Sequence, residues 1–147
     1  MKIAVTGLNN VDNPGPGVPV IRGIKESKEF DGEIVGLMYD ALEPGAYMPE
    51  VAKSNYLIPY PSGGLDIFFE RLSKINEIEK IDVIIPTLDA ELFAFAKLKP
   101  KLESIGIKTL VPTIDQLTIR GQDTHLIFAK RIILLRLKIS GSSVQTL

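Results

Sequence analysis

Short apolar runs alternate along the chain with longer segments in which apolar residues recur at helical spacing. The short runs, rich in Val, Ile and Leu, predict strands over residues 2–6, 33–40, 56–60, 82–87 and 108–111. The helical spacing predicts helices over residues 18–28, 65–78 and 91–105. Strands that alternate with helices favour parallel pairing through right-handed crossovers. We therefore predict an α/β fold, with an open, mainly parallel sheet of four to five strands and helices on both faces.

Prolines and phenylalanines refine these elements. Pro59 cannot donate a ladder hydrogen bond, so we expect the third strand at a sheet edge. Pro100 lies inside the helix at 91–105 and predicts a kink or a split there. In the helix at 65–78, an apolar stripe is expected to pack on the sheet through Phe68 and Phe69; its members are Leu65, Phe68, Phe69, Leu72, Ile75 and Ile78.

A long loop rich in Gly, Asn and Pro follows the first strand. A loop at this place opens the ligand crevice of an open α/β sheet, so Gly7, Gly15 and Gly17 are candidate cofactor-binding residues. Their spacing matches neither the dinucleotide fingerprint nor a P-loop. The glycines either shape the turn alone or turn backbone N–H groups toward an anionic ligand at the helix N-terminus. Asp40, at the end of the second strand, stands where a ribose-binding acid would lie.

A second polar segment, at residues 86–92, follows the fourth strand and faces the same crevice. It contains Asp89 and Glu91. Both also have a structural interpretation, because Asp89 is a natural N-cap and Glu91 suits the first turn of a helix. No further residue completes a catalytic set, so the catalytic residues stay unknown. The lone histidine, His125, fits a helix surface better than catalysis.

Composition narrows the partners and the compartment. The formal charge of -1 provides no basic field for nucleic acid, and the chain has no cysteine for a disulfide, a thiolate metal site or a nucleophile. It shows neither a secretion signal nor a run of about twenty apolar residues. With 147 residues, 45% of them apolar, it is long enough for one core. We expect a cytoplasmic protein that binds no nucleic acid, no membrane and no metal.

Four segments, taken in order, resemble the N-terminal pre-ATP-grasp domain of ATP-grasp ligases, which has a Rossmann-like fold. They are Val5-Thr6-Gly7 with residues 13–18 and Arg22, then residues 52–56 before Pro59, then residues 84–92, and finally residues 117–130. The chain is most similar to the carbamoyl-phosphate synthase large-subunit-like, carboxylate-amine ligase type. The resemblance covers residues 1–130, which we take as one domain.

The resemblance implies a role in an ATP-dependent ligase. Such enzymes use ATP and magnesium to convert a carboxylate into an acyl phosphate, which an amine or similar nucleophile attacks. Two later lobes hold ATP and the metal, and this chain ends before either of them. The first domain helps to hold the acceptor substrate, which makes Asn9, Asn10, Asp89 and Glu91 candidate substrate-binding residues.

By this resemblance the chain is inactive alone, holds no tightly bound cofactor, and has the missing lobes as partners. The alternative is a free-standing Rossmann-like module for a small ligand or a nucleotide. The chain departs from the family at residues 122–124, where Gln-Asp-Thr replaces an Asp-Lys pair, and at residues 131–147, which lack the junction to the first lobe. A truncation, a frameshift or a split ligase would each explain this atypical tail. The tail is basic and apolar, so we expect the chain to form a homodimer.

Overall fold

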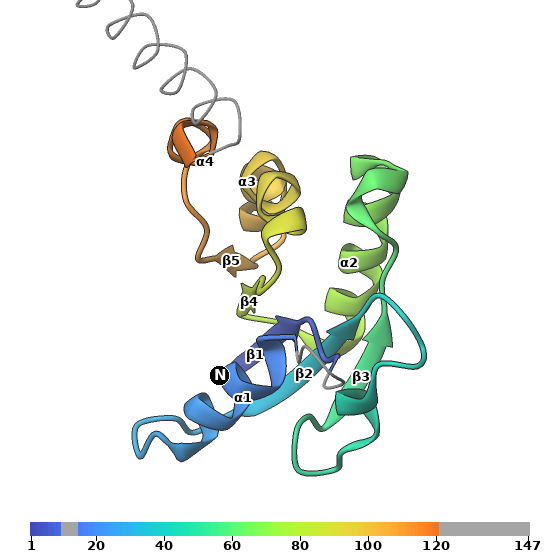
Figure 1. Cartoon of the computed structure of the whole chain (residues 1–147), viewed down its shortest axis with the longest axis vertical. Helices are drawn as coiled ribbons and strands as arrows, with labels where there is room; N and C mark the ends of the chain where they lie inside the picture. The colour runs from blue at the N-terminus through green and yellow to red at the C-terminus, as the bar shows by residue number, and fades with distance from the viewer. Residues whose placement is uncertain (10–14, 121–147) are drawn as a thin grey trace, which may run out of the picture. The chain divides into compact units, whose positions relative to one another are not determined.

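The computed structural model describes residues 1–9 and 15–120 (Figure 1). The chain divides into two compact units, Met1–Pro112 and Thr113–Leu147. The second unit contains helix α4 (Ile114–Arg120). The predicted domain end at residue 130 lies outside the described residues and stays a prediction, as does every expectation for the tail.

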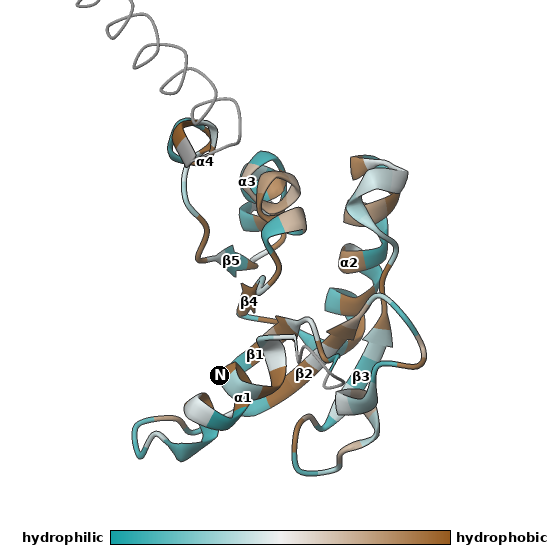
Figure 2. Ribbon diagram, viewed as in Figure 1, coloured by the Kyte–Doolittle hydropathy of each residue, from teal (hydrophilic) through white to brown (hydrophobic). Residues whose placement is uncertain are grey.

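The first unit is built on a five-stranded, wholly parallel sheet in the order β3-β2-β1-β4-β5. The strands are β1 (Lys2–Thr6), β2 (Glu33–Met38), β3 (Ser54–Leu57), β4 (Val83–Ile85) and β5 (Lys108–Thr109). The central strands carry continuous apolar runs because both of their faces are covered (Figure 2). The predicted α/β class, with its parallel sheet, is therefore confirmed.

Helices cover both faces of this sheet, as the alternation along β1 shows. Val5 belongs to a core with Ile21 of helix α1 (Gly17–Glu26). Its neighbour Ala4 belongs to a second core with Phe68 of helix α2 (Leu65–Glu79) and Phe95 of helix α3 (Asp89–Ser104). Successive strand residues point to opposite faces, so α1 covers one face while α2 and α3 cover the other.

The third strand lies at the sheet edge as predicted, but it begins earlier and ends before Pro59. Its register aligns Ser54 with Val35 and Leu57 with Met38. The segment from β2 to β3 contains no α-helix, only the 3-10 turn η1 (Pro44–Tyr47). A second 3-10 turn, η2 (Pro61–Gly63), leads from β3 into α2.

Helix α3 continues through Pro100 and is not split. Pro100 lies on the exposed side of the helix. The stripe predicted for α2 is wrong only at Ile78, which is 69% exposed. Phe68, Leu72 and Ile75 are buried, and the half-buried Phe69 packs against the same core. The buried three follow the spacing of one helical line, and Phe69 is turned about 100° away from it. No helix in the described part of the chain is long and apolar enough to cross a membrane.

Candidate functional site

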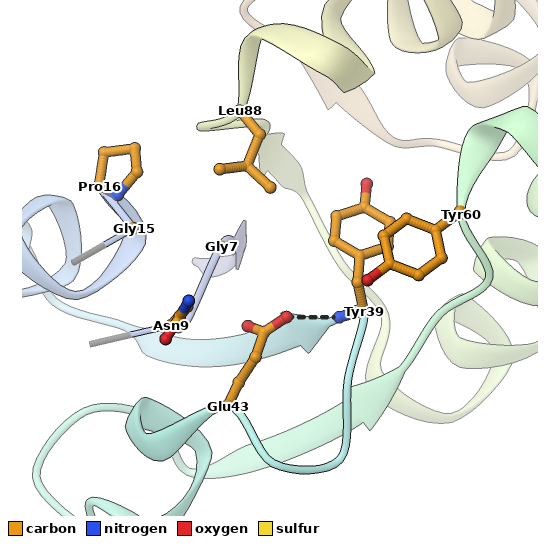
Figure 3. A pocket seen from close by; sticks show the side chains of 8 residues that line it. All are labelled: Gly7, Asn9, Gly15, Pro16, Tyr39, Glu43, Tyr60 and Leu88. Carbon is orange, nitrogen blue, oxygen red and sulfur yellow. Dashed lines mark hydrogen bonds between the residues drawn. The ribbon is translucent and has the colours of Figure 1, made fainter. Parts of the chain in front are cut away.

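A cavity of about 350 Å³ lies where β1, β2 and β4 end (Figure 3). Its lining comes from the segments that follow these strands, from the segment after β3 and from the residues that lead into α1: Gly7, Asn9, Gly15, Pro16, Tyr39, Glu43, Tyr60 and Leu88. The carboxyl ends of parallel strands are the usual place for a ligand in an open α/β sheet. The crevice predicted beside the first loop is therefore present.

Glycine lets helix α1 begin directly against the end of β1. The Gly17 amide donates to the Gly7 carbonyl oxygen at 3.1 Å. A Cβ atom at Gly17 would overlap the carbonyl oxygen of Thr6 and come within 2.5 Å of the Gly7 oxygen. Gly7 itself has a φ of 70°, which favours glycine. These contacts support the interpretation that the glycines shape the turn.

The start of α1 has little capacity for an anion. Among its first four residues, the Gly17 amide donates to Gly7, the Val20 amide donates to Pro16, and Pro19 has no N–H. At most one amide, that of Val18, is left for a ligand. Phosphate sites at helix N-termini rely on several such donors, so this helix start does not fit a di- or triphosphate.

Glu91 is a buried carboxylate that ties three strand ends together. Its Oε1 accepts hydrogen bonds from the Thr6 hydroxyl, from the Thr87 amide at 2.7 Å and from the Leu88 amide at 2.9 Å. Its Oε2 accepts from the Tyr39 hydroxyl. Burial, followed by the charge of Glu91, raises the pKa of Tyr39 far above its usual value, so the phenol stays protonated. Only 1% of Glu91 is exposed, and it lies outside the cavity lining.

Glu43 is buried, and only one of its two carboxylate oxygens accepts hydrogen bonds from the described residues. Its Oε1 accepts hydrogen bonds from the Tyr39 amide at 2.8 Å and the Asp40 amide at 3.3 Å. Its Oε2 is buried and has no hydrogen-bond partner among the described residues. Glu43 is 8% exposed and lines the cavity, with its carboxylate between Asn9 and Tyr39 (Figure 3). A buried carboxylate oxygen without a partner is costly, so this atom is suited to accept from a bound donor.

Two tyrosines form one wall of the cavity. The rings of Tyr39 and Tyr60 stack with centroids 5.0 Å apart and an interplanar angle of 14°. Tyr39 is buried, whereas Tyr60 is 59% exposed. The Tyr39 ring holds that of Tyr60 at the cavity, where an aromatic face can meet a cation or an apolar group of a ligand.

The predicted site residues differ in where they lie relative to the cavity. Gly7, Asn9 and Gly15 line the cavity, whereas Gly17 supports it from behind. Asp89 is exposed on the first turn of α3 and lies outside the lining, and the N-cap of that helix is Leu88 rather than Asp89. Glu91 is the hydrogen-bonded support described above. Asn10 and His125 lie outside the described residues; whether any of these residues binds a ligand stays a prediction.

Sequence reasoning did not name five of the lining residues as site residues, and the two whose chemistry matters most are Glu43 and Tyr60; the others are Pro16, Tyr39 and Leu88. Glu43 lies in a segment without helical or strand periodicity, and Tyr60 is the last residue of the strand predicted over residues 56–60, which ends at Leu57 in the structure. Asp40, the acid expected at the end of β2, is exposed and accepts the Leu42 amide at 2.8 Å in a local turn. The one available signal was the placement of Glu43 three residues beyond Asp40, in the loop that follows a central strand. Polar loop residues after parallel strands are the usual source of ligand contacts.

The cavity does not fit the triphosphate of ATP with magnesium. Its described lining contains one carboxylate, no Lys and no Arg, and the adjoining helix start offers at most one amide. Within residues 1–9 and 15–120, no group of three or more His, Cys, Asp and Glu side chains could hold a metal ion. We therefore derive no chemical step through ATP or magnesium in this chain.

No protein-family model and no curated protein sequence matches this chain. Among solved structures, it is similar to the UDP-GlcNAc 2-epimerase from Neisseria meningitidis, whose structure was determined with bound UDP-GlcNAc. The TM-score is 0.40 and the identity 15%, over 75% of this chain and 31% of the epimerase. The chain thus spans about a third of that enzyme's length. The assignment of a Rossmann-like α/β fold rests on the strand order and the two helical layers described above.

Proposed function

We propose that this chain is a small-ligand-binding module with a Rossmann-like fold, and that its ligand occupies the cavity at the ends of β1, β2 and β4. The observation that carries the proposal is the unpartnered Oε2 of Glu43, buried in the cavity lining. Burying this atom without a hydrogen bond costs free energy that a ligand donor would recover. If Glu43 only supported the fold, nothing would offset this cost.

A second candidate is the substrate-side domain of an ATP-grasp ligase. Two of the four segments that carry this resemblance meet at the cavity, since Gly7, Gly15 and Pro16 of the first segment and Leu88 of the third line it. In this proposal the chain forms one wall of a substrate site. The ATP-grasp lobes, encoded in the same gene or in a separate chain, would bring ATP and magnesium.

Binding is tested by nuclear magnetic resonance with the intact, 15N-labelled chain. A panel of small cations, small anions, neutral polyols and nucleosides is titrated while the backbone amides are followed. We expect at least one class to shift the amides of Gly7, Tyr39 and Asp40 in a saturable way, and to leave the β5 amides unchanged. Absence of any saturable shift at the cavity across the panel would reject the binding module.

The ligase proposal is tested by activity and by gene context. We expect the pure chain to release no ADP from ATP with magnesium, because its described residues offer no phosphate cradle. An open reading frame for ATP-grasp lobes directly downstream, or a separate chain that restores ATP turnover, would support this proposal. Magnesium-dependent ADP release by the pure chain, abolished by mutation of one of its own residues, would contradict it.

A further inference from the structure

The charge around the cavity is negative and uncompensated within the described residues. Glu43 and Glu91 approach Tyr39 from two sides, the first at its amide and the second at its hydroxyl. Both glutamates are more than nine-tenths buried. The lining itself has no Lys or Arg to balance them. A cation in the cavity would therefore be attracted, whereas a phosphate or carboxylate would be repelled.

The hydrogen-bonding groups at the cavity call for a donor. The carbonyl oxygens of Gly7 and Asn9 already accept from the Gly17 and Gly15 amides. The Tyr39 hydroxyl is engaged with Glu91. Glu43 Oε2 is buried without a hydrogen-bond partner among the described residues, and a carboxylate oxygen accepts hydrogen bonds. A neutral hydroxyl could donate to it, but would leave the buried charge unbalanced.

The aromatic wall favours the same kind of ligand. The Tyr60 ring stacks on that of Tyr39 with centroids 5.0 Å apart, and Tyr60, 59% exposed, is one of the residues that line the cavity. The face of a tyrosine ring attracts an ammonium group within about 6 Å of its centroid. Glu43 and Tyr60 thus offer a carboxylate and a ring face in one small cavity, a common combination for holding an ammonium cation.

We infer that the cavity is a subsite for a small primary amine bound as its ammonium cation. Glu43 Oε2 accepts a hydrogen bond from the ammonium group, and Tyr60 provides an aromatic wall for the charge and the adjoining carbon atoms. This inference rests on the proposed binding function and names the ligand class for that site.

The test is a titration of the 15N-labelled intact chain with four probes: propylammonium, 1-propanol, propionate and adenosine. The first three share size and shape and differ in charge, and adenosine supplies a neutral ribose and a base. The Tyr39 and Asp40 amides are direct reporters, since both donate to Glu43. We expect saturable shifts with millimolar propylammonium, and binding at least about tenfold weaker for 1-propanol and propionate, as the loss of a charge-assisted hydrogen bond implies.

Two variants and one control variant test whether Glu43 and Tyr60 contribute to propylammonium binding. Glu43→Gln keeps an oxygen for the Tyr39 and Asp40 amides but places a donor, without charge, at the cavity, so propylammonium affinity should fall about tenfold or more. Tyr60→Leu changes an exposed residue and should lower the affinity about two- to fivefold. Glu77→Gln alters an exposed glutamate of α2 and should leave the affinity unchanged.

The outcomes separate this inference from the binding function itself. Equal affinity of propylammonium for the original chain and for Glu43→Gln would overturn the amine subsite. Shifts at the cavity with adenosine or propionate, and none with propylammonium, would also overturn it while leaving a binding module in place. No shift with any of the four probes would overturn the amine subsite and count against the binding module as well. If Glu43→Gln failed to fold, the comparison of propylammonium with 1-propanol and the Tyr60→Leu variant would still decide.

Discussion

Two glutamates at the carboxyl edge of the sheet have opposite hydrogen-bond balances. Glu91 accepts four hydrogen bonds and is fully engaged in holding strand ends. Glu43 accepts hydrogen bonds from two amides with one oxygen, whereas the other oxygen is buried without a partner among the described residues. Residue type and burial alone do not distinguish them, because both are nearly inaccessible acids. The difference lies in how many donors the fold brings to each carboxylate.

We expect Glu91→Ala to lower the free energy of unfolding by about 2–4 kcal/mol. The change leaves the buried hydroxyls of Thr6 and Tyr39, and the amides just before α3, without their acceptor. Chemical denaturation measures the change. The matched variant Glu103→Ala removes an exposed glutamate from the same helix and should cost less than about 0.5 kcal/mol. Similar losses for both variants would contradict the supporting role of Glu91.

Glu79 at the end of α2 provides a pH-dependent contact. It accepts from Lys2 at 2.7 Å, from the Ser54 hydroxyl at 2.6 Å and from the Tyr56 hydroxyl at 2.7 Å. Burial alone would raise the pKa of Glu79, but the hydrogen bonds from Lys2, Ser54 and Tyr56 outweigh it and lower the pKa to about 2. A carboxyl with a lowered folded-state pKa stabilises the fold above its unfolded value of 4.5 and loses that contribution as the pH falls toward 2.

We therefore expect the stability of the chain to fall between pH 4.5 and about 2, with Glu79 contributing at most about 3 kcal/mol to that fall. Urea denaturation at several pH values measures the decrease. In Glu79→Gln the side chain no longer titrates, so the decrease over this window should be smaller. An identical pH dependence in both chains would exclude Glu79 as a source.

At the scale of elements, helix α2 shows how one residue of register decides burial. Phe68 is fully buried and meets the Phe95 ring edge to face at 5.3 Å. Phe69 is half-buried, and the Lys101 ammonium lies 5.6 Å from its ring centroid. Both rings pack on the same core as predicted, but adjacent helical residues point in different directions, so Phe68 lies inside the core and Phe69 at its margin.

Phe68→Ala should lower the free energy of unfolding by about 3–5 kcal/mol, because it leaves a cavity between α2, α3 and the sheet. Phe69→Ala makes the same chemical change one position along the helix and should cost only about 1 kcal/mol, since its ring is partly exposed already. Chemical denaturation of the two variants side by side checks this. Equal losses would show that the helix does not have the described register.

The contact between β1 and α1 depends on Gly17. A methyl group there would overlap backbone carbonyl oxygens of Thr6 and Gly7, which cannot move aside as a flexible side chain can. Gly17→Ala should therefore destabilise the chain by about 2–3 kcal/mol and change the cavity resonances. Gly23→Ala, in the same helix, meets nothing within 4 Å and should stabilise by about 0.5–1 kcal/mol, which a thermal denaturation comparison would reveal. The prediction requires that the two variants change the stability of the chain in opposite directions.

At the scale of the whole molecule, we predict that the chain forms a homodimer. The motivation is the basic, apolar composition of residues 131–147, because an apolar patch of this kind is usually covered by a partner and a two-fold dimer closes the assembly. Sedimentation compares the intact chain with a chain that ends after Lys130. A monomeric intact chain at micromolar concentration would contradict the prediction, and a dimer that persists in the shorter chain would place the interface elsewhere.

The α/β architecture of the first unit could be predicted from local patterns in the sequence. Buried parallel strands appear as continuous apolar runs and helices as stripes at helical spacing, so both are local patterns that can be recognised without partners. The alternation of the two predicted a parallel sheet with two helical layers, and the glycine-rich loop after the first strand indicated the crevice. Several strand ends and the different burial of Phe68 and Phe69 were not predicted correctly, because both depend on which residues pack against them in the folded chain.

The hydrogen-bonding properties of the crevice could not be predicted from the sequence, because they depend on contacts that form only in the folded chain. Thr6, Tyr39 and Thr87 are far apart in the chain, and the parallel register of β1, β2 and β4 is what brings their donors to Glu91. One oxygen of Glu43 has no donor among the described residues. Whether a buried acid supports the fold or awaits a ligand depends on the sum of hydrogen bonds from distant segments, and that sum exists only once the chain has folded.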